Sequence, residues 1–321
     1  MNIHAPVPAP QFDEQNAVFA ADVIEALSQH PKKLSPKYFY DAAGSELFEQ
    51  ITKLPEYYPT RTELGILRAR GADLHAIIPK GAALVEFGAG ATTKVRLLLD
   101  QCEFAACVPV DISGDFLNAQ AAELRTDFPA LDVHPVTADF TAPFALPDAV
   151  KAMPKVGFFP GSTLGNFEPH EACAFLRSAR EILGPGALLV IGIDLEKDER
   201  VLHTAYNDAA GVTGRFNLNV LVRINAELGG NFDLSGFAHR AIYNKERHRI
   251  EMHLIAKKPQ TVRVLGHSFA FRAGESIHTE SSYKYSLERF TALARGSGWN
   301  PKASWTDAAK MFSVHALVAG E

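Results

Sequence analysis

The sequence predicts an α/β protein with a parallel, doubly wound sheet, and three observations support this fold class. Five short apolar runs alternate with helical segments, which is typical of strands covered on both faces. The alternation stops between Asp194 and Leu287, and a chain of 321 residues is longer than one typical domain. We therefore expect an α/β domain and a second, α+β domain inserted into it. The five runs are 83–87, 106–111, 133–136, 156–159 and 188–193.

The segment before the first run contains helices but no strand–helix–strand unit. Apolar residues over 16–29 recur at helical spacing until Pro31, and a second helix is predicted over 45–51. The first dozen residues are rich in Pro and Ala, and they are expected to form a flexible arm.

The C-terminal part is expected to return to the first sheet. Residues 249–255 and 260–264 are predicted to be antiparallel strands. A helix over 287–296 and strands over 303–305 and 312–319 would then add an antiparallel edge to the first sheet. The predicted domains are 61–196 with 287–321 for a cofactor, 13–60 with 197–286 for a substrate, and the arm at 1–12.

Composition excludes several classes of partner. The chain is 47% hydrophobic and carries a net charge of -5, so it has no general attraction to nucleic acid or to an anionic membrane. It has neither a membrane-length apolar run nor the basic, apolar start of a secretion signal. Its three cysteines form no Cys-x-x-Cys pair, and no zinc spacing occurs among its histidines. We expect a cytoplasmic, monomeric protein without a metal, acting on a small molecule.

A Gly-x-Gly turn follows the first predicted strand. Gly88 and Gly90 lie between that strand and a helix over 95–99, at the sheet edge where open α/β folds bind cofactors. Glycine lets the backbone approach a ligand closely. Lys94, just before this helix, is part of the same predicted site. The turn alone is equally compatible with a dinucleotide-binding site.

Acidic side chains follow the next two strands. Asp111 comes about 20 residues after the turn, where it could accept both hydroxyl groups of a ribose. Asp139 and Phe140 offer a carboxylate for an exocyclic amine and a ring for a flat base. Thr93 stands where a pyrophosphate site has a third glycine. The predicted ligand is therefore a nucleoside without phosphates. The alternative is that these are ordinary strand-end acids, which are common at sheet edges.

Glu86, just before the turn, narrows the choice of nucleoside. A carboxylate there would suit the cationic methionine end of S-adenosylmethionine. We therefore predict a Rossmann-like class I methyltransferase fold with this cofactor. Methyl transfer from a sulfonium is an in-line displacement that needs neither a metal nor a covalent nucleophile. The predicted cofactor residues are Glu86, Gly88, Gly90, Lys94, Asp111, Asp139 and Phe140.

The loop 160–169 after the fourth strand lies at the same sheet edge, and its Asn166 could both donate to a carboxylate and accept from an amine. With four further blocks, this loop resembles the histidine-specific methyltransferases of ergothioneine biosynthesis, which form the α-N-trimethylated betaine of L-histidine. The resemblance extends from about Leu34 to the C-terminus. The blocks are 37–41, 55–61, 161–169, 205–212 and 279–282.

The resemblance implies a set of substrate residues. Asn166 and Tyr206 would hold the amine and carboxylate, and Glu280 and Ser282 would bind the imidazole. The pocket would also be lined by Tyr40, Tyr57, Gly161 and Met252. An apolar strand residue such as Met252 is more often core, and Tyr57 or Tyr206 alone would equally fit a packing role.

The residues themselves agree on the imidazole pair. If 277–285 is a strand, Glu280 and Ser282 are two residues apart and share a face. A carboxylate and a hydroxyl that address one ring would reject apolar amino acids, which would leave both groups unpaired.

The chemistry requires the amine to lose a proton before it attacks. Tyr40, Tyr57 or an ordered water could take this proton, and the residues do not decide among them. A third methyl removes the last lone pair, so trimethylation is a natural end point.

Three alternatives stay open at this point. A related enzyme could methylate another amino acid, such as tryptophan. The glycine turn also fits a dinucleotide-dependent oxidoreductase, and a non-catalytic sensor could keep the same site.

Overall fold

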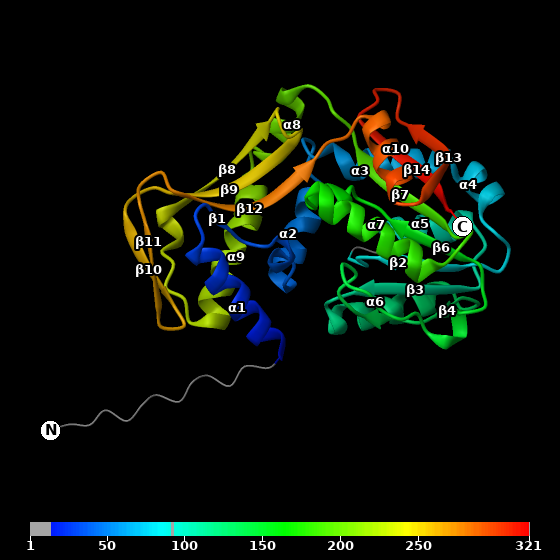
Figure 1. The fold of residues 1–321 in the computed structure, drawn as a ribbon, viewed down its shortest axis with the longest axis horizontal. Coiled ribbons are helices and arrows are strands. Elements are labelled where there is room, and N and C mark those ends of the chain that lie inside the picture. Colours follow the sequence, from blue (N-terminus) through cyan, green and yellow to red (C-terminus); the bar gives the residue numbers. More distant parts are fainter. Residues whose placement is uncertain (1–13, 91–92, 321) are drawn as a thin grey trace. The chain divides into compact units, whose positions relative to one another are not determined.

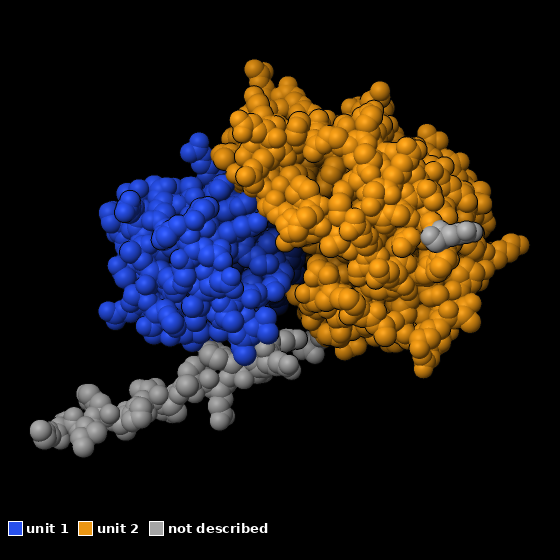
Figure 2. All heavy atoms as spheres, viewed as in Figure 1, with its two compact units in different colours: residues 1–48, 210–241, 252–280 blue, residues 49–209, 242–251, 281–321 orange. Residues whose placement is uncertain are grey.

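The computed structural model describes residues 14–90 and 93–320, which divide into two compact units (Figure 2). Unit 1 comprises the described residues up to 48 with 210–241 and 252–280, and unit 2 comprises 49–209, 242–251 and 281–320. The predicted arm at 1–12 and residues 91–92 of the glycine turn lie outside the described residues. The domain bounds given above stay a prediction.

Unit 2 contains the predicted sheet (Figure 1). Its order is β13-β14-β7-β6-β2-β3-β4, and β5 also pairs with β3. All pairs from β4 and β5 through β7 are parallel, whereas β14 and β13 add an antiparallel edge. The predicted fold class is confirmed. The strands are β2 (Ala83–Phe87), β3 (Ala106–Asp111), β4 (Asp132–Val133), β5 (Val136–Thr137), β6 (Lys155–Phe159), β7 (Leu188–Asp194), β13 (Trp299–Thr306) and β14 (Phe312–Ala319).

Both faces of this sheet are buried because its strands are apolar throughout. Val85 of β2 packs into one core and its neighbour Leu84 into the other, as strand alternation requires. One face is covered by α7 (Pro169–Leu183) and α10 (Leu287–Gly296). The other is covered by α3 (Tyr58–Ala69), α4 (Gly71–Ile77), α5 (Thr93–Gln101) and α6 (Gly114–Asp127). The remaining elements of unit 2 are α8 (Glu199–Tyr206), η2 (Asp148–Val150) and η3 (Thr163–Asn166).

One predicted strand differs in the structure. Residues 133–136 form two short strands, β4 and β5, instead of one. Pro135 lies in the interruption, and Pro109 lies in the adjacent stretch of β3. Proline has no N–H to donate, so the ladder of hydrogen bonds is broken here.

Unit 1 combines helices with antiparallel and parallel strands. Its four-stranded sheet has the order β1-β12-β9-β8, and β10 and β11 form a separate antiparallel pair. Four of the five boundaries between the units fall within α2, β8, β9 and β12, and the fifth, at 209/210, falls between α8 and α9. The elements are α1 (Glu14–Ser28), β1 (Lys32–Lys33), η1 (Pro36–Phe39), α2 (Ala42–Thr52), α9 (Val212–Leu228), η4 (Leu234–Gly236), β8 (Phe237–Asn244), β9 (Arg249–Ala256), β10 (Gln260–Val264), β11 (His267–Phe271) and β12 (Ser276–Tyr283).

Polar side chains join the elements of unit 1. Asn217 of α9 accepts a hydrogen bond from the Thr279 hydroxyl of β12 at 2.7 Å and donates to the His253 carbonyl oxygen at 3.1 Å. Thr279 also lies 3.0 Å from the carbonyl oxygen of Met252. Asn219 donates to Asp41 at 2.7 Å, which ties the start of α2 to α9. Among the described helices, none is both long and apolar enough to cross a membrane.

Candidate active site

The glycine turn lies at the point of the sheet where strand order reverses. β2 has β3 on one side and β6 on the other, and open α/β sheets bind ligands at the carboxyl ends of such strands. Gly88 has a φ of +73°, and a Cβ placed on it would lie 3.2 Å from the Phe140 ring. Apart from Gly90 itself and its chain neighbours, no described residue has an atom within 4 Å of a Cβ placed on Gly90. The turn is therefore backed by an aromatic ring at Gly88 and is open at Gly90.

The predicted cofactor acids lie beside this turn. The amides of Gly88 and Ala89 both donate to the Val110 carbonyl oxygen at 2.9 Å, which places the next residue, Asp111, next to the glycines. The Asp111 carboxylate accepts a hydrogen bond from the Ser113 amide at 2.9 Å, and partial burial raises its pKa.

Asp139 and Phe140 reach the same edge through the neighbouring strand. The amide of Ala138 donates to the Asp111 carbonyl oxygen at 3.0 Å. Asp139 is exposed and accepts from the Thr141 amide at 2.9 Å. The Phe140 ring packs 5.7 Å from the ring of Phe159. A carboxylate that faces solvent and an anchored ring thus lie side by side, as binding of a flat base would require.

Glu86 is the most perturbed carboxyl group of this edge. It is 3% exposed, and burial raises its pKa to about 8, against the opposing effect of the cation of Lys94 and with a smaller contribution from Asp111. A buried carboxyl group that lacks a full countercharge can accept a bound cation, because the cation restores its charged form.

Replacing Glu86 with glutamine is expected to flatten the pH dependence of stability. Between pH 4.5 and 8 the folded chain holds a proton that the unfolded chain has released. The free energy of unfolding therefore falls as pH rises through this window, by up to about 1.4 kcal/mol per unit for this one group. Denaturant unfolding between pH 4.5 and 8 measures the slope of the free energy of unfolding against pH for the wild type and for Glu86→Gln. The exposed Glu123→Gln serves as the control. Equal slopes for the wild type and Glu86→Gln would contradict a raised pKa of Glu86 in the folded chain.

Glu63 of α3 connects Lys94, in the helix after the glycine turn, to the loop 160–169. The sequence analysis did not identify this residue. Its buried carboxylate pairs with Lys94 at 2.6 Å and accepts the Gly161 amide hydrogen, with both oxygens 2.9 Å from the nitrogen. A Cβ on Gly192 of β7 would clash with the carboxylate. A glycine inside a strand signals such a close approach, so Gly192 was the available clue.

The loop after β6 is held in a tight conformation. Gly161 and Ser162 have φ values of +82° and +57°, and the Ser162 hydroxyl accepts a hydrogen bond from the Asp194 amide at 2.9 Å. A Cβ on Gly165 would lie 2.8 Å from the Tyr283 carbonyl oxygen. Asn166 ends η3 and is half-buried, and within the described ranges its side-chain amide has no hydrogen-bond partner.

Tyr206 and Ser282, predicted for the two ends of one substrate, are direct neighbours in unit 2. The Tyr206 and Ser282 hydroxyl groups lie 2.9 Å apart, and the buried ammonium of Lys284 donates to both. The Tyr57 ring lies 6.3 Å from the Tyr206 ring. Tyr206 and Ser282 are 76 positions apart in sequence, so only the fold brings them together.

Behind these hydroxyl groups lies a buried charged cluster that the sequence did not reveal. Asp194 ends β7 and pairs with Lys284 at 2.7 Å and Lys197 at 2.5 Å, and it accepts the Tyr58 hydroxyl hydrogen. Burial opposes the charge of Asp194, but Lys284 and Lys197 hold its pKa below the usual value. Burial, and then Asp194, raise the pKa of Tyr58, and burial lowers that of Lys197 to about 8. Asp194 is the last residue of its strand, as Asp111 is of β3. This position was the sequence signal that could have pointed to Asp194.

The remaining predicted residues lie in unit 1. Met252 in β9 and Glu280 in β12 are buried. Tyr40 is 38% exposed, with its ring 5.7 Å from the rings of Phe48 and Phe216. Glu280 and Ser282 both belong to β12, so the strand on which their pairing depended is confirmed. The roles of these side chains stay predictions.

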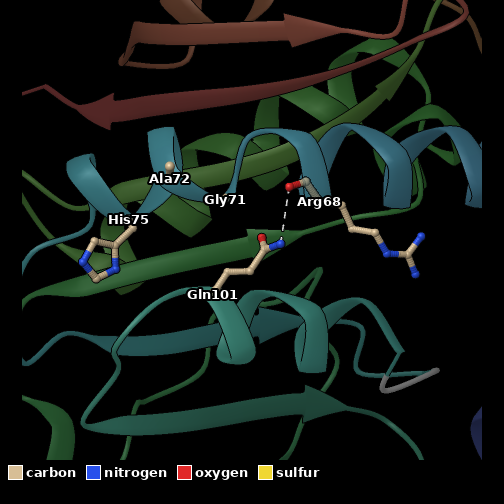
Figure 3. A pocket seen from close by; sticks show the side chains of 5 residues that line it. All are labelled: Arg68, Gly71, Ala72, His75 and Gln101. Atoms are coloured by element: carbon tan, nitrogen blue, oxygen red, sulfur yellow. Dashed lines mark hydrogen bonds between the residues drawn. The ribbon is translucent and has the colours of Figure 1, made fainter.

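A shallow surface hollow lies elsewhere on unit 2 (Figure 3). It is formed by α3, α4 and the last residue of α5, Gln101, at the opposite end of that helix from the glycine turn. It holds none of the predicted site residues. In the described part of the chain, no three His, Cys, Asp or Glu side chains are grouped as metal ligands. The lining residues are Arg68, Gly71, Ala72, His75 and Gln101.

The strand order, the antiparallel edge and the glycine turn with its strand-end acids define a class I S-adenosylmethionine-dependent methyltransferase. Comparison with known proteins then identifies the family. Residues 19–319 match the family described as histidine-specific methyltransferase, SAM-dependent, and the chain belongs to this family. It is an enzyme that uses S-adenosylmethionine, which decides against the dinucleotide alternative.

Similar proteins come from bacteria and fungi. The chain is 42% identical to a histidine N-alpha-methyltransferase of Mycolicibacterium smegmatis, over 92% of this chain and 94% of that protein. It is 39% identical to the protein of the same name from Mycobacterium tuberculosis, over 94% and 95%. It is 29% identical to ergothioneine biosynthesis protein 1 of Neurospora crassa, over 86% of this chain and 32% of that longer protein.

Proposed function

We propose that this enzyme transfers methyl groups from S-adenosylmethionine to the α-amino group of L-histidine three times, giving hercynine for ergothioneine biosynthesis. The names of the bacterial and fungal relatives support the substrate and the pathway. That the enzyme acts as a monomer in the cytoplasm stays a prediction.

The hydrogen bond between Tyr206 and Ser282 is the observation that carries the proposal. One hydroxyl is assigned to the α-carboxylate and the other to the imidazole, and they lie 2.9 Å apart. In histidine a short side chain separates these two groups. A site in which both are bound by adjacent hydroxyl groups therefore fits a small, compact amino acid with polar groups at both ends.

The cofactor residues are assigned by the chemistry each can supply. Asp111 would accept the ribose hydroxyl hydrogens, and Asp139 and Phe140 would bind the amine and the face of the adenine. The backbone at Gly88 and Gly90 would approach the cofactor closely. Glu86 would face its cationic end, and Lys94 would support this side through its pair with Glu63.

The substrate residues would hold the amino acid at three places. Asn166 and Tyr206 would bind the amine and carboxylate, beside Gly161 and Tyr57. Glu280 would accept an imidazole N–H, next to Ser282 and the apolar wall formed by Met252. A buried carboxylate committed to a ring N–H is a strong basis for preferring histidine.

S-adenosylmethionine supplies an electrophilic methyl carbon on its sulfonium. The enzyme's part is to remove a proton from the substrate ammonium, align the lone pair and exclude water. Asn166 can orient the amine, and Tyr40, Tyr57 or a water can pass the proton to solvent. After the third transfer the nitrogen has no lone pair, so the reaction stops.

Incubation with S-adenosylmethionine and a pool of amino acids tests the proposal. Mass spectrometry should detect histidine with one, two and finally three added methyl groups. Accumulation of the dimethyl form at exhaustion of histidine would refute the trimethylation. A mass gain on tryptophan with none on histidine would instead support the alternative of another amino acid.

A further inference from the structure

We infer that Lys284 is a positioning residue, which fixes the Tyr206 and Ser282 hydroxyl groups so that together they present one hydrogen to the substrate. The inference rests on the proposed function, because it concerns the same substrate site. No role at this site follows from the sequence patterns for Lys284, which lies just after β12.

The ammonium of Lys284 is fully committed to three acceptors. Its side chain is 0% exposed, and its nitrogen lies 2.9 Å from the Tyr206 oxygen, 2.8 Å from the Ser282 oxygen and 2.7 Å from Asp194. An ammonium has three hydrogens and cannot accept a hydrogen bond. Each hydrogen therefore has one partner, and both hydroxyl oxygens act as acceptors toward Lys284.

This geometry determines where the hydroxyl hydrogens can go. Tyr206 and Ser282 have one hydroxyl hydrogen each, and neither can be donated to Lys284. One of them is used in the 2.9 Å bond between the two oxygens. The other is directed outside this group of three side chains. A carboxylate oxygen or an unprotonated imidazole nitrogen is the acceptor that suits it.

Charge holds Lys284 in place and favours the same ligand. Asp194 compensates one lysine, but the cluster also contains Lys197, 2.5 Å from Asp194. With both lysines protonated, the buried cluster carries one excess positive charge. A substrate that binds with its carboxylate next to Tyr206 would be stabilised by this charge, since the interaction is weakly screened in a buried site.

The inference is tested with Lys284→Ala, which removes the atoms of a propylammonium ion. The Michaelis constant for histidine should rise about tenfold to a hundredfold, as loss of an oriented hydrogen bond to a charged group predicts. The affinity for S-adenosylhomocysteine should change less than about twofold, because the cofactor residues are untouched. Asp194 keeps Lys197 and Tyr58 as partners in this variant. Added propylammonium should lower the Michaelis constant again, whereas neutral n-propanol should not.

Matched variants separate positioning from folding. Lys32 is another buried lysine, 2% exposed and paired with Glu275, and Lys32→Ala should leave the Michaelis constant for histidine unchanged. If Lys284→Ala does not fold, the similarly sized Lys284→Met should show the same rise without rescue by amine.

Two results would overturn the inference, namely an unchanged Michaelis constant or equal rescue by amine and alcohol. If the wild type does not methylate histidine, the proposed function itself fails, so the two failures are distinguishable.

Discussion

Replacing Glu63 with alanine is expected to lower kcat/KM for histidine about a hundredfold or more and to weaken S-adenosylhomocysteine binding as well. The variant leaves Lys94 without its partner and the Gly161 amide without an acceptor. Removing one member of a buried ion pair costs about 3–5 kcal/mol, because the other charge is left uncompensated. Lys94 and Gly161 belong to the two proposed binding sites, so both ligands should be affected. Steady-state kinetics and calorimetry with S-adenosylhomocysteine measure the two effects.

Two more variants define what the Glu63 carboxylate does. Glu63→Gln keeps a neutral acceptor for the Gly161 amide but removes the charge opposite Lys94, so it should damage cofactor binding more than histidine binding. Gly192→Ala should reproduce the alanine variant, since its Cβ would displace the carboxylate. Glu123, in an exposed pair with Arg96 at 3.1 Å, provides the control, and Glu123→Ala should behave like the wild type. A Glu63→Ala enzyme with unchanged constants for both ligands would contradict this role.

Replacing Glu280 with alanine is expected to lower kcat/KM for histidine about a hundredfold to a thousandfold. The proposed hydrogen bond from the imidazole to a buried carboxylate is charge-assisted, and such bonds are about twice as strong as neutral ones. The same change should narrow the preference for histidine over tryptophan, because it removes the carboxylate that is proposed to recognise the imidazole. Competition between the two amino acids, read by mass spectrometry, measures the preference directly.

Neighbouring changes on β12 provide the controls for Glu280. Glu280→Gln retains an acceptor oxygen and should fall between the wild type and the alanine variant. Ser281 is directed to the opposite face of the strand by its alternation, so Ser281→Ala should keep the histidine preference. If Glu280→Ala methylates histidine as efficiently as the wild type, the imidazole is bound by other groups.

The local patterns of the sequence were sufficient for most of the fold. β2, β3, α10 and β14 have the bounds that were expected, because apolar runs and helical spacing are properties of neighbouring residues. That the glycine turn and the strand-end acids lie together followed from the same patterns, since a turn and acids after parallel strands must meet at one sheet edge. The interruption at Pro135 was missed because it depends also on Pro109 in the adjacent strand.

The partners of the site residues were decided only by the tertiary structure. The sequence indicated Gly161, Tyr206 and Ser282, but it did not indicate Glu63, which lies 98 positions from Gly161, or Lys284, which lies 78 from Tyr206. A buried charge is stable only where the fold supplies a countercharge or donor, and these come from segments distant in sequence. The sequence by itself determined which groups could meet a cofactor and an amino acid. The fold decided which buried charges hold those groups in position.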